Sequence, residues 1–218
     1  MDENRFGPDR RGLEVLTQSG EQILRRGWRA DGGGSAALAV FPAAEHPAPA
    51  YLERLASEYA LKDELDSTWA VRPLEPVREP GRVVLVLEDP GGEPLDRWLG
   101  APMEIESFLR LAANIAAVLG KVHERGLVHK DIKPVHILVS DAGEVHLTGF
   151  GLASRLRRER PSLELPELIA GTLPYLAPEQ TGRMNRSIDS RGDLYAMGVT
   201  LYEMLTGSLP FTATDPME

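Results

Sequence analysis

Short apolar runs, separated by glycine and proline, dominate the first part of the chain. Residues 21–41 are predicted to form two strands around the turn-forming sequence at 31–34, Asp-Gly-Gly-Gly. Residues 51–65 place apolar side chains at three- and four-residue intervals, which predicts an amphipathic helix. Residues 82–88, RVVLVLE, contain an uninterrupted apolar run at 83–87, which predicts a buried strand. The first part therefore predicts a β-rich unit with one helix.

Helical spacing dominates the second part of the chain. Its widest apolar stripe runs from Glu104 to Glu124 and predicts a well-buried helix with these apolar members: Ile105, Phe108, Leu109, Ala112, Ile115, Ala116 and Leu119. Another helix is predicted over 193–205, with one side formed by Leu194, Met197, Leu201, Met204 and Leu205. The remaining predicted elements are a short helical piece and two short strands around a turn, at residues 94–100, 137–139 and 145–147.

Composition and charge narrow the class of protein. The 218 residues are 42% hydrophobic and 26% charged, as in ordinary globular domains, and the net charge of −9 argues against a surface that neutralises nucleic-acid phosphates. No apolar run reaches the roughly 18 to 20 residues that cross a bilayer, so we expect a cytoplasmic location without membrane contact. The chain has no cysteine, which excludes disulfides, cysteine-ligated zinc and a thiol nucleophile.

Four motifs follow one another in the second part of the chain: HKDIKPVHIL at 129–138, GFG at 149–151, GTLPYLAPEQ at 171–180 and DLYAMG at 193–198. In this order they resemble the catalytic loop, the Asp-Phe-Gly segment, the Ala-Pro-Glu segment and the central helix of Ser/Thr protein kinases. The strings PEQTGRMNR and LYEMLTGSLPF further resemble the kinase-like domain that opens large bacterial sensor proteins, where an AAA-type ATPase region, a GAF domain and a histidine kinase module come after it. The resemblance covers the chain from about residue 20 onward.

The resemblance implies an α+β, bilobal protein-kinase-like fold with a small β-rich N-lobe and a mainly helical C-lobe. We expect an N-terminal extension over 1–20, an N-lobe with a five-stranded sheet and one helix over 21–88, a hinge over 89–94 and a C-lobe over 95–218. In such kinases further helices come after the central helix. We therefore expect the C-lobe to be incomplete, truncated after that helix, and the chain to be a fragment or to depend on a further polypeptide segment for its stability.

Two residues that such kinases use in phosphoryl transfer are present. Asp131 matches the aspartate that orients the acceptor hydroxyl, although a cap of the turn before Pro134 is an alternative. Lys133 matches the lysine that approaches the transferred phosphate. Structural roles in the loop, the activation segment and the central helix are implied for His129, Thr172, Glu179 and Asp193. For Asp193 the expected contact is with the loop backbone near His129, and a helix N-cap is the alternative.

The groups that hold metal in such kinases are missing. His136 stands where the resemblance requires a metal-binding asparagine, and Gly149 stands where it requires a metal-binding aspartate. Magnesium prefers hard oxygen ligands in octahedral geometry, which an imidazole supplies poorly and glycine not at all. We therefore expect no metal site and interpret His136 as a packing residue.

The parts that bind nucleotide are also degenerate. The turn formed by Gly32, Gly33 and Gly34 departs from the Gly-x-Gly-x-x-Gly spacing, and the strand after it, SAALAVFP, has no lysine. Glu58 matches the helical glutamate that would pair with that lysine. Without the lysine, a solvated acid on the helix face is the alternative. Binding of ATP, with or without magnesium, stays open at this point.

These features support two hypotheses. In the first, the domain is a pseudokinase in bacterial signal transduction: its groove and activation segment sense a protein partner or small ligand, and it acts on downstream signalling domains of the same polypeptide. In the second, it is an active ATP-dependent Ser/Thr kinase with unusual metal ligands such as Asp141 or Glu88. Gly149 separates the two, because neither Thr148 nor His146 before it is a good magnesium ligand.

Overall fold

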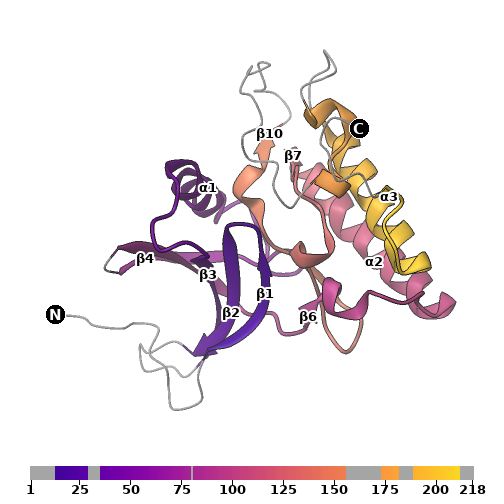
Figure 1. The fold of residues 1–218 in the computed structure, drawn as a ribbon, viewed down its shortest axis with the longest axis horizontal. Coiled ribbons are helices and arrows are strands. Elements are labelled where there is room, and N and C mark those ends of the chain that lie inside the picture. Colours follow the sequence, from indigo (N-terminus) through magenta and orange to yellow (C-terminus); the bar gives the residue numbers. More distant parts are fainter. Residues whose placement is uncertain (1–12, 29–34, 80, 156–172, 182–188, 212–218) are drawn as a thin grey trace.

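The structure is a computed structural model that describes residues 13–28, 35–79, 81–155, 173–181 and 189–211. A β-sheet with one helix beside it occupies one side of the molecule, and two long helices occupy the other (Figure 1). This arrangement confirms the expected α+β fold with a β-rich N-terminal region and a mainly helical region after it.

Five antiparallel strands form the N-terminal sheet in the order β1-β2-β3-β5-β4. Their bounds are Glu14–Ser19 (β1), Gln22–Trp28 (β2), Ala36–Pro42 (β3), Pro73–Glu79 (β4) and Arg82–Glu88 (β5). The strands predicted within 21–41 are β2 and β3, and β5 has the predicted bounds. The sheet begins inside the range expected to be an N-terminal extension. β1 was not predicted, because it has a single buried side chain, Leu16, and therefore no clear apolar pattern.

Helix α1 (Pro49–Ala60) covers one face of this sheet. It begins with proline in the first turn, where the missing N–H would have had no partner in the helix. Tyr51 and Leu55 of α1 pack with Leu38, Leu85 and other apolar residues of the strands. The third buried residue of α1 is an acid, Glu58.

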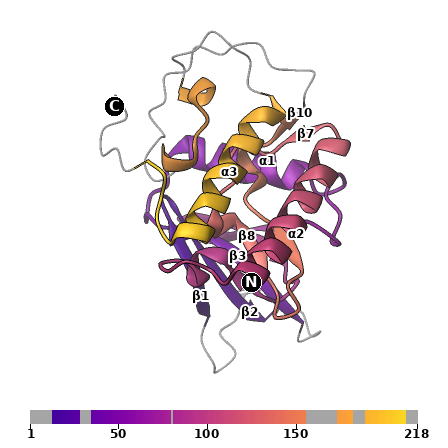
Figure 2. The same cartoon turned by 90° about the vertical axis from the view of Figure 1, so that its right-hand side faces the viewer.

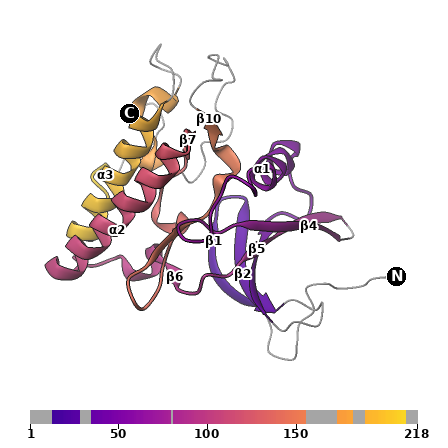
Figure 3. The ribbon, with the colours of Figure 1, turned by 180° about the vertical axis from the view of Figure 1, so that it is seen from behind.

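The C-terminal part is built on helices α2 (Ile105–Glu124) and α3 (Ser190–Thr206), which lie side by side (Figures 1 and 2). Seen from behind, the two helices and the sheet lie on opposite sides of the molecule (Figure 3). No helix of the described ranges is both long and apolar enough to cross a membrane. The shorter elements are β6 (Glu93–Pro94), η1 (Leu95–Trp98), β7 (Leu127–Val128), η2 (Pro134–His136), β8 (Ile137–Val139), β9 (Val145–Leu147), η3 (Phe150–Leu152), β10 (Ser154–Arg155), η4 (Leu173–Tyr175) and η5 (Pro178–Thr181).

The buried faces of the long helices differ in part from the predicted stripes. On α2 the core contacts come from Leu111, Ile115, Val118, Leu119 and Val122, whereas Ile105 and Leu109 are 57% and 60% exposed. On α3 the exposed residues include Leu194 and Leu205, and the buried ones include Asp193, Ala196, Val199, Thr200 and Met204. Each helix carries apolar residues around more than one side, so periodicity alone did not fix which side faces the core.

This difference predicts opposite results for two substitutions in α2. We expect Ile115→Ala to lower the free energy of unfolding by about 2–5 kcal/mol, because a buried side chain leaves a cavity. Leu109→Ala should change it by no more than about 0.5 kcal/mol, because that side chain is exposed. Urea unfolding followed by circular dichroism measures both values. Equal losses in the two variants would contradict the observed face of α2.

Candidate functional site

The carboxylate of Asp193 holds the loop between β7 and η2. Its Oδ2 accepts a hydrogen bond from the backbone N–H of His129 at 2.8 Å, and its Oδ1 accepts one from the backbone N–H of Lys130 at 2.7 Å. His123 of α2 places Nε2 2.9 Å from the same Oδ2. The N-cap of α3 is Asp189, so the alternative interpretation of Asp193 as the cap is wrong. Asp193 instead ties α2, α3 and the loop together.

His129 braces the same loop from inside the protein. Its Nε2 donates to the backbone carbonyl of Thr148 at 3.0 Å, and its Nδ1 accepts from the backbone N–H of Asp131 at 3.2 Å. The ring is fully buried against Phe150, and this burial lowers the pKa of His129. His129 therefore stays neutral and connects the loop to the segment that carries Gly149.

Asp131 and Lys133 form a buried ion pair. The Nζ of Lys133 lies 2.9 Å from Oδ2 of Asp131, and the side chains are only 8% and 11% exposed. Burial alone would raise the pKa of Asp131, but the neighbouring His136 and Lys133 outweigh it and hold that pKa below its ordinary value. The aspartate is therefore ionised at neutral pH. Its other oxygen, Oδ1, has no hydrogen-bond partner among the described residues.

His136 lies between the ion pair and the sheet. Its Nδ1 donates to the backbone carbonyl of Asp131 at 2.9 Å, so its Nε2 accepts from the amide of Gln22 at 3.0 Å. One neutral tautomer satisfies both bonds. Burial lowers the pKa of His136 to about 4, which keeps the ring neutral at neutral pH. The imidazole thus acts as a packed, hydrogen-bonded link between the loop and β2.

The position of the His136 ring leaves room only for glycine at residue 149. Its φ of 79° lies in the left-handed region that disfavours residues with a side chain. A Cβ at position 149 would lie 2.7 Å from three atoms of the His136 ring, which is closer than atoms pack. A carboxylate cannot stand at residue 149 while the imidazole keeps its place. The two departures from the kinase pattern are therefore linked by direct contact.

Glu58 is buried on the opposite side of the same region. It is 3% exposed, so the alternative of a solvated acid on the helix face is wrong. Burial raises the pKa of Glu58 to about 7, although the backbone N–H groups of Phe150 and Gly149 favour its ionised form. Val40 of β3 lines a small cavity together with Glu58. Strand β3, with the sequence AALAVFP, has no lysine to pair with Glu58.

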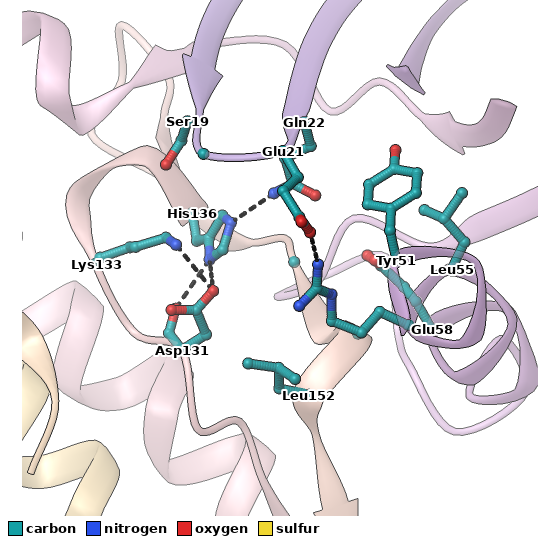
Figure 4. Close-up of a pocket in the computed structure, with 14 residues that line it drawn as sticks. Ser19, Glu21, Gln22, Tyr51, Leu55, Glu58, Asp131, Lys133, His136 and Leu152 are labelled. Atoms are coloured by element: carbon teal, nitrogen blue, oxygen red, sulfur yellow. Dashed lines mark hydrogen bonds and ion pairs between the residues drawn. The ribbon is translucent and has the colours of Figure 1, made fainter. Parts of the chain in front are cut away.

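A cavity of about 130 Å³ separates the α1 side from the loop side. Figure 4 shows Tyr51, Leu55 and Glu58 of α1 on one side of it and Asp131, Lys133 and His136 on the other. The turn between β1 and β2 also lines the cavity, through Ser19, Gly20, Glu21 and Gln22. This turn was missed in the sequence because it has one glycine and comes after the unpredicted strand β1.

The turn between β1 and β2 is fastened on two sides. Glu21 forms an ion pair with Arg54 of α1, and Gln22 bonds His136 (Figure 4). Gly32, Gly33 and Gly34, expected in the nucleotide-binding turn, lie outside the described residues. The strand ends that they connect, Trp28 and Ala36, pair at the opposite end of β2 and β3 from Gln22. The turn over the cavity is therefore the one at Gly20.

The remaining predicted residues lie elsewhere. Thr172 is outside the described residues. Glu179 lies in η5, where it is partly exposed. Neither Asp141 nor Glu88, the suggested unusual metal ligands, lines the cavity, and Glu88 instead contacts Ser67 and Arg72. Within the described ranges no three His, Asp or Glu side chains are grouped so as to hold a metal ion.

Magnesium–nucleotide does not fit the side chains that line this cavity. The residue that would supply a carboxylate is Gly149, whose Cβ position is blocked by the imidazole of His136, and β3 has no lysine to pair with the buried glutamate. Phosphates would meet the acids Glu58 and Asp131 without metal between them. The volume is also below the roughly 300–1,000 Å³ typical of sites that enclose a drug-sized ligand.

Comparison with known proteins gives a consistent family match. Residues 33–218 match the family described as protein kinase domain. Serine/threonine-protein kinase Pkn1 of Myxococcus xanthus is 37% identical over 136 residues, which are 61% of this chain and 19% of that protein. Serine/threonine-protein kinase PknB of Mycobacterium tuberculosis is 34% identical over 116 residues, 53% of this chain and 18% of that protein. The alignments thus span about a fifth of the length of these curated relatives.

The contact between residues 136 and 149 predicts a non-additive pair of substitutions. Gly149→Ala should cost about 2 kcal/mol or more of stability, from left-handed strain and from collision with the imidazole. In a His136→Ala background the same change should cost about 0.5–3 kcal/mol less. Gly81→Ala is the matched control, because Gly81 has the same φ of 79° and no atom within 4 Å of its Cβ position. Unfolding curves that give additive costs would contradict the contact.

The buried carboxyl of Glu58 predicts a pH-dependent stability. Its pKa of about 7 in the folded chain exceeds the ordinary 4.5, so folding takes up a proton between these values and stability falls as pH rises through 7. His136 has the opposite effect between pH 4 and 6.5, because its pKa is lowered. Because the parent and Glu58→Gln both contain His136, this opposite effect cancels in the difference between their stability profiles. The stability of Glu58→Gln relative to the parent should rise by about 3 kcal/mol from pH 4 to 8.

The control for this profile is Glu53→Gln, which removes an exposed acid from the same helix. Denaturant unfolding at a series of pH values should give Glu53→Gln the profile of the parent chain. A difference between Glu58→Gln and the parent that does not vary with pH would show that Glu58 ionises normally.

Proposed function

This chain belongs to the protein kinase domain family, and we propose that it acts within that family as a regulatory or sensor module without phosphoryl-transfer activity. The observation that carries the proposal is the imidazole of His136, packed where a side chain at residue 149 would have to stand. Kinases depend on magnesium and a lysine to neutralise the phosphates. Here histidine and glycine stand where the metal ligands would be, and β3 has no lysine.

The combined losses outweigh the retained groups. Loss of one preorganised charge-stabilising group commonly reduces an enzyme's rate by about 100- to 1,000-fold. Asp131 and Lys133 remain, but Oδ2 of Asp131 is held in the pair with Lys133. Their close pairing stabilises the loop. We infer that these residues serve the conformation of the loop.

The output of such a module is a conformational state of the region around the cavity. Its hairpin turn, helix α1 and loop are linked by the pairs Glu21–Arg54 and Gln22–His136, so a change at one reaches the others. We propose that the receivers are downstream signalling domains of the same polypeptide or a protein partner, in a bacterial signalling pathway in the cytoplasm. The negative net charge of −9 makes nucleic acid or an anionic membrane a poor partner.

An active Ser/Thr kinase with unusual metal ligation is the second candidate. It is favoured by the Asp131–Lys133 pair, which keeps the two side chains of the catalytic loop within 2.9 Å, and by the relatives that are named Ser/Thr kinases. This candidate needs a carboxylate near Gly149 in place of the missing ligand. Glu58 is the nearest acid from α1, but its raised pKa makes it a weak ligand at neutral pH.

The proposal predicts that ATP stabilises the chain no more with magnesium than without it. A thermal-shift titration with ATP, in magnesium and in excess chelator, measures this directly. Phosphate transfer from labelled ATP to a generic Ser/Thr substrate protein should equal that of Asp131→Asn, with a relative such as Pkn1 as the active control. Magnesium-dependent stabilisation together with transfer that Asp131→Asn abolishes would establish the active-kinase alternative.

A further inference from the structure

Three residues that line the same cavity each carry a buried polar atom with no hydrogen-bond partner among the described residues. The atoms are Oη of Tyr51, Oε1 of Glu58 and Oδ1 of Asp131. Tyr51 is 1% exposed and Glu58 3% exposed, so bulk water does not reach them freely. Buried polar groups in proteins are nearly always hydrogen-bonded. Because three residues around one cavity carry such atoms, a group bound inside the cavity would supply the missing partners.

The chemistry of the three atoms selects the charge of that group. All three can accept hydrogen bonds, and two belong to carboxyl groups. The nearby cations are engaged by other acids, because Arg54 pairs with Glu21 and Lys133 pairs with Asp131. Anions would be repelled by Glu58 and Asp131. A positively charged N–H donor satisfies the acceptors and neutralises the buried acid.

The size of the cavity limits the group further. Its 130 Å³ is about ten times what one water molecule needs and below the range of sites for drug-sized ligands. Leu55 and the ring of Tyr51 add apolar surface beside the acceptors (Figure 4). A group of a few non-hydrogen atoms, with a charged end and a short apolar part, matches both the volume and the lining.

We propose that this cavity binds a small organic cation, an alkylammonium or guanidinium group, with Glu58 as its principal acceptor and Asp131 and Tyr51 as further acceptors. An ammonium has three donors and no acceptor, and a guanidinium has five donors, so either one can meet several of these oxygens. The inference rests on the proposed function, since it names the ligand class that the module senses.

Binding of the cation is coupled to the proton on Glu58. The buried carboxyl has a pKa of about 7, and a cation beside it favours the ionised form. Affinity should therefore rise as pH increases through 7 and level off above it. A cation held only by surface acids would show no such change in this range, because those acids are already ionised.

The test is a calorimetric titration of the full 218-residue chain with ethylammonium and methylguanidinium chlorides at pH 6 and pH 8. We expect saturable binding with a dissociation constant in the millimolar range, which suits ligands of so few atoms, and tighter binding at pH 8. Glu58→Gln should weaken binding at least tenfold and remove its pH dependence. Tyr51→Phe should weaken it several-fold. The exposed Glu53→Gln is the matched control and should bind as the parent does.

Tetramethylammonium, which has no N–H donor, should not bind. Absence of saturable binding at pH 8, or equal binding of tetramethylammonium or of Glu58→Gln, would overturn the proposal. If Glu58→Gln does not fold, Tyr51→Phe and the pH dependence of the parent decide the outcome.

ATP with magnesium is titrated in parallel. If the parent chain binds both the cation and ATP with magnesium, only the proposed function is overturned. If it binds neither, only this inference is overturned.

Discussion

One buried carboxylate, that of Asp193, fixes the loop on which the whole site depends. A buried charge is tolerated only when its oxygens are hydrogen-bonded, and here two backbone N–H groups and His123 supply the bonds. The two bonds to the backbone hold Lys130 at a φ of 69°, the only positive φ outside glycine in the described ranges. The resulting turn directs Asp131 and His136 to one side, toward the cavity.

Packing at the end of that loop decides the chemistry of the site. The neutral imidazole of His136 is held by two hydrogen bonds and leaves room only for glycine at residue 149. In the sequence, His136 and Gly149 were two separate departures from the kinase pattern. The contact between them makes each residue depend on the other. On the facing wall, Glu58 is buried beside valine and keeps a raised pKa. The chain thus has a kinase fold, and the chemistry of its cavity depends on which side chains this packing brings together.

Much of the fold was accessible from sequence because local patterns encode it. The continuous apolar run of β5 and the long stripe of α2 predicted those elements almost to the residue. The four ordered motifs predicted the kinase fold, and the family match supports it. Within the site, the residues of the loop from His129 to His136 were identified from sequence because they form one continuous motif. The missing lysine and carboxylate were equally visible, since they are identities at single positions.

Tertiary structure alone decided which residues meet in the cavity. β1 has a single buried residue, so its place in the sheet is set by pairing with β2 and not by its own pattern. Gln22 and His136 are 114 positions apart, and their bond depends on how the sheet sits on the loop. The burial of Glu58 likewise depends on packing of α1 against η3. Sequence determined the elements because their periodicity is local, whereas long-range packing determined burial, pKa and the shape of the cavity.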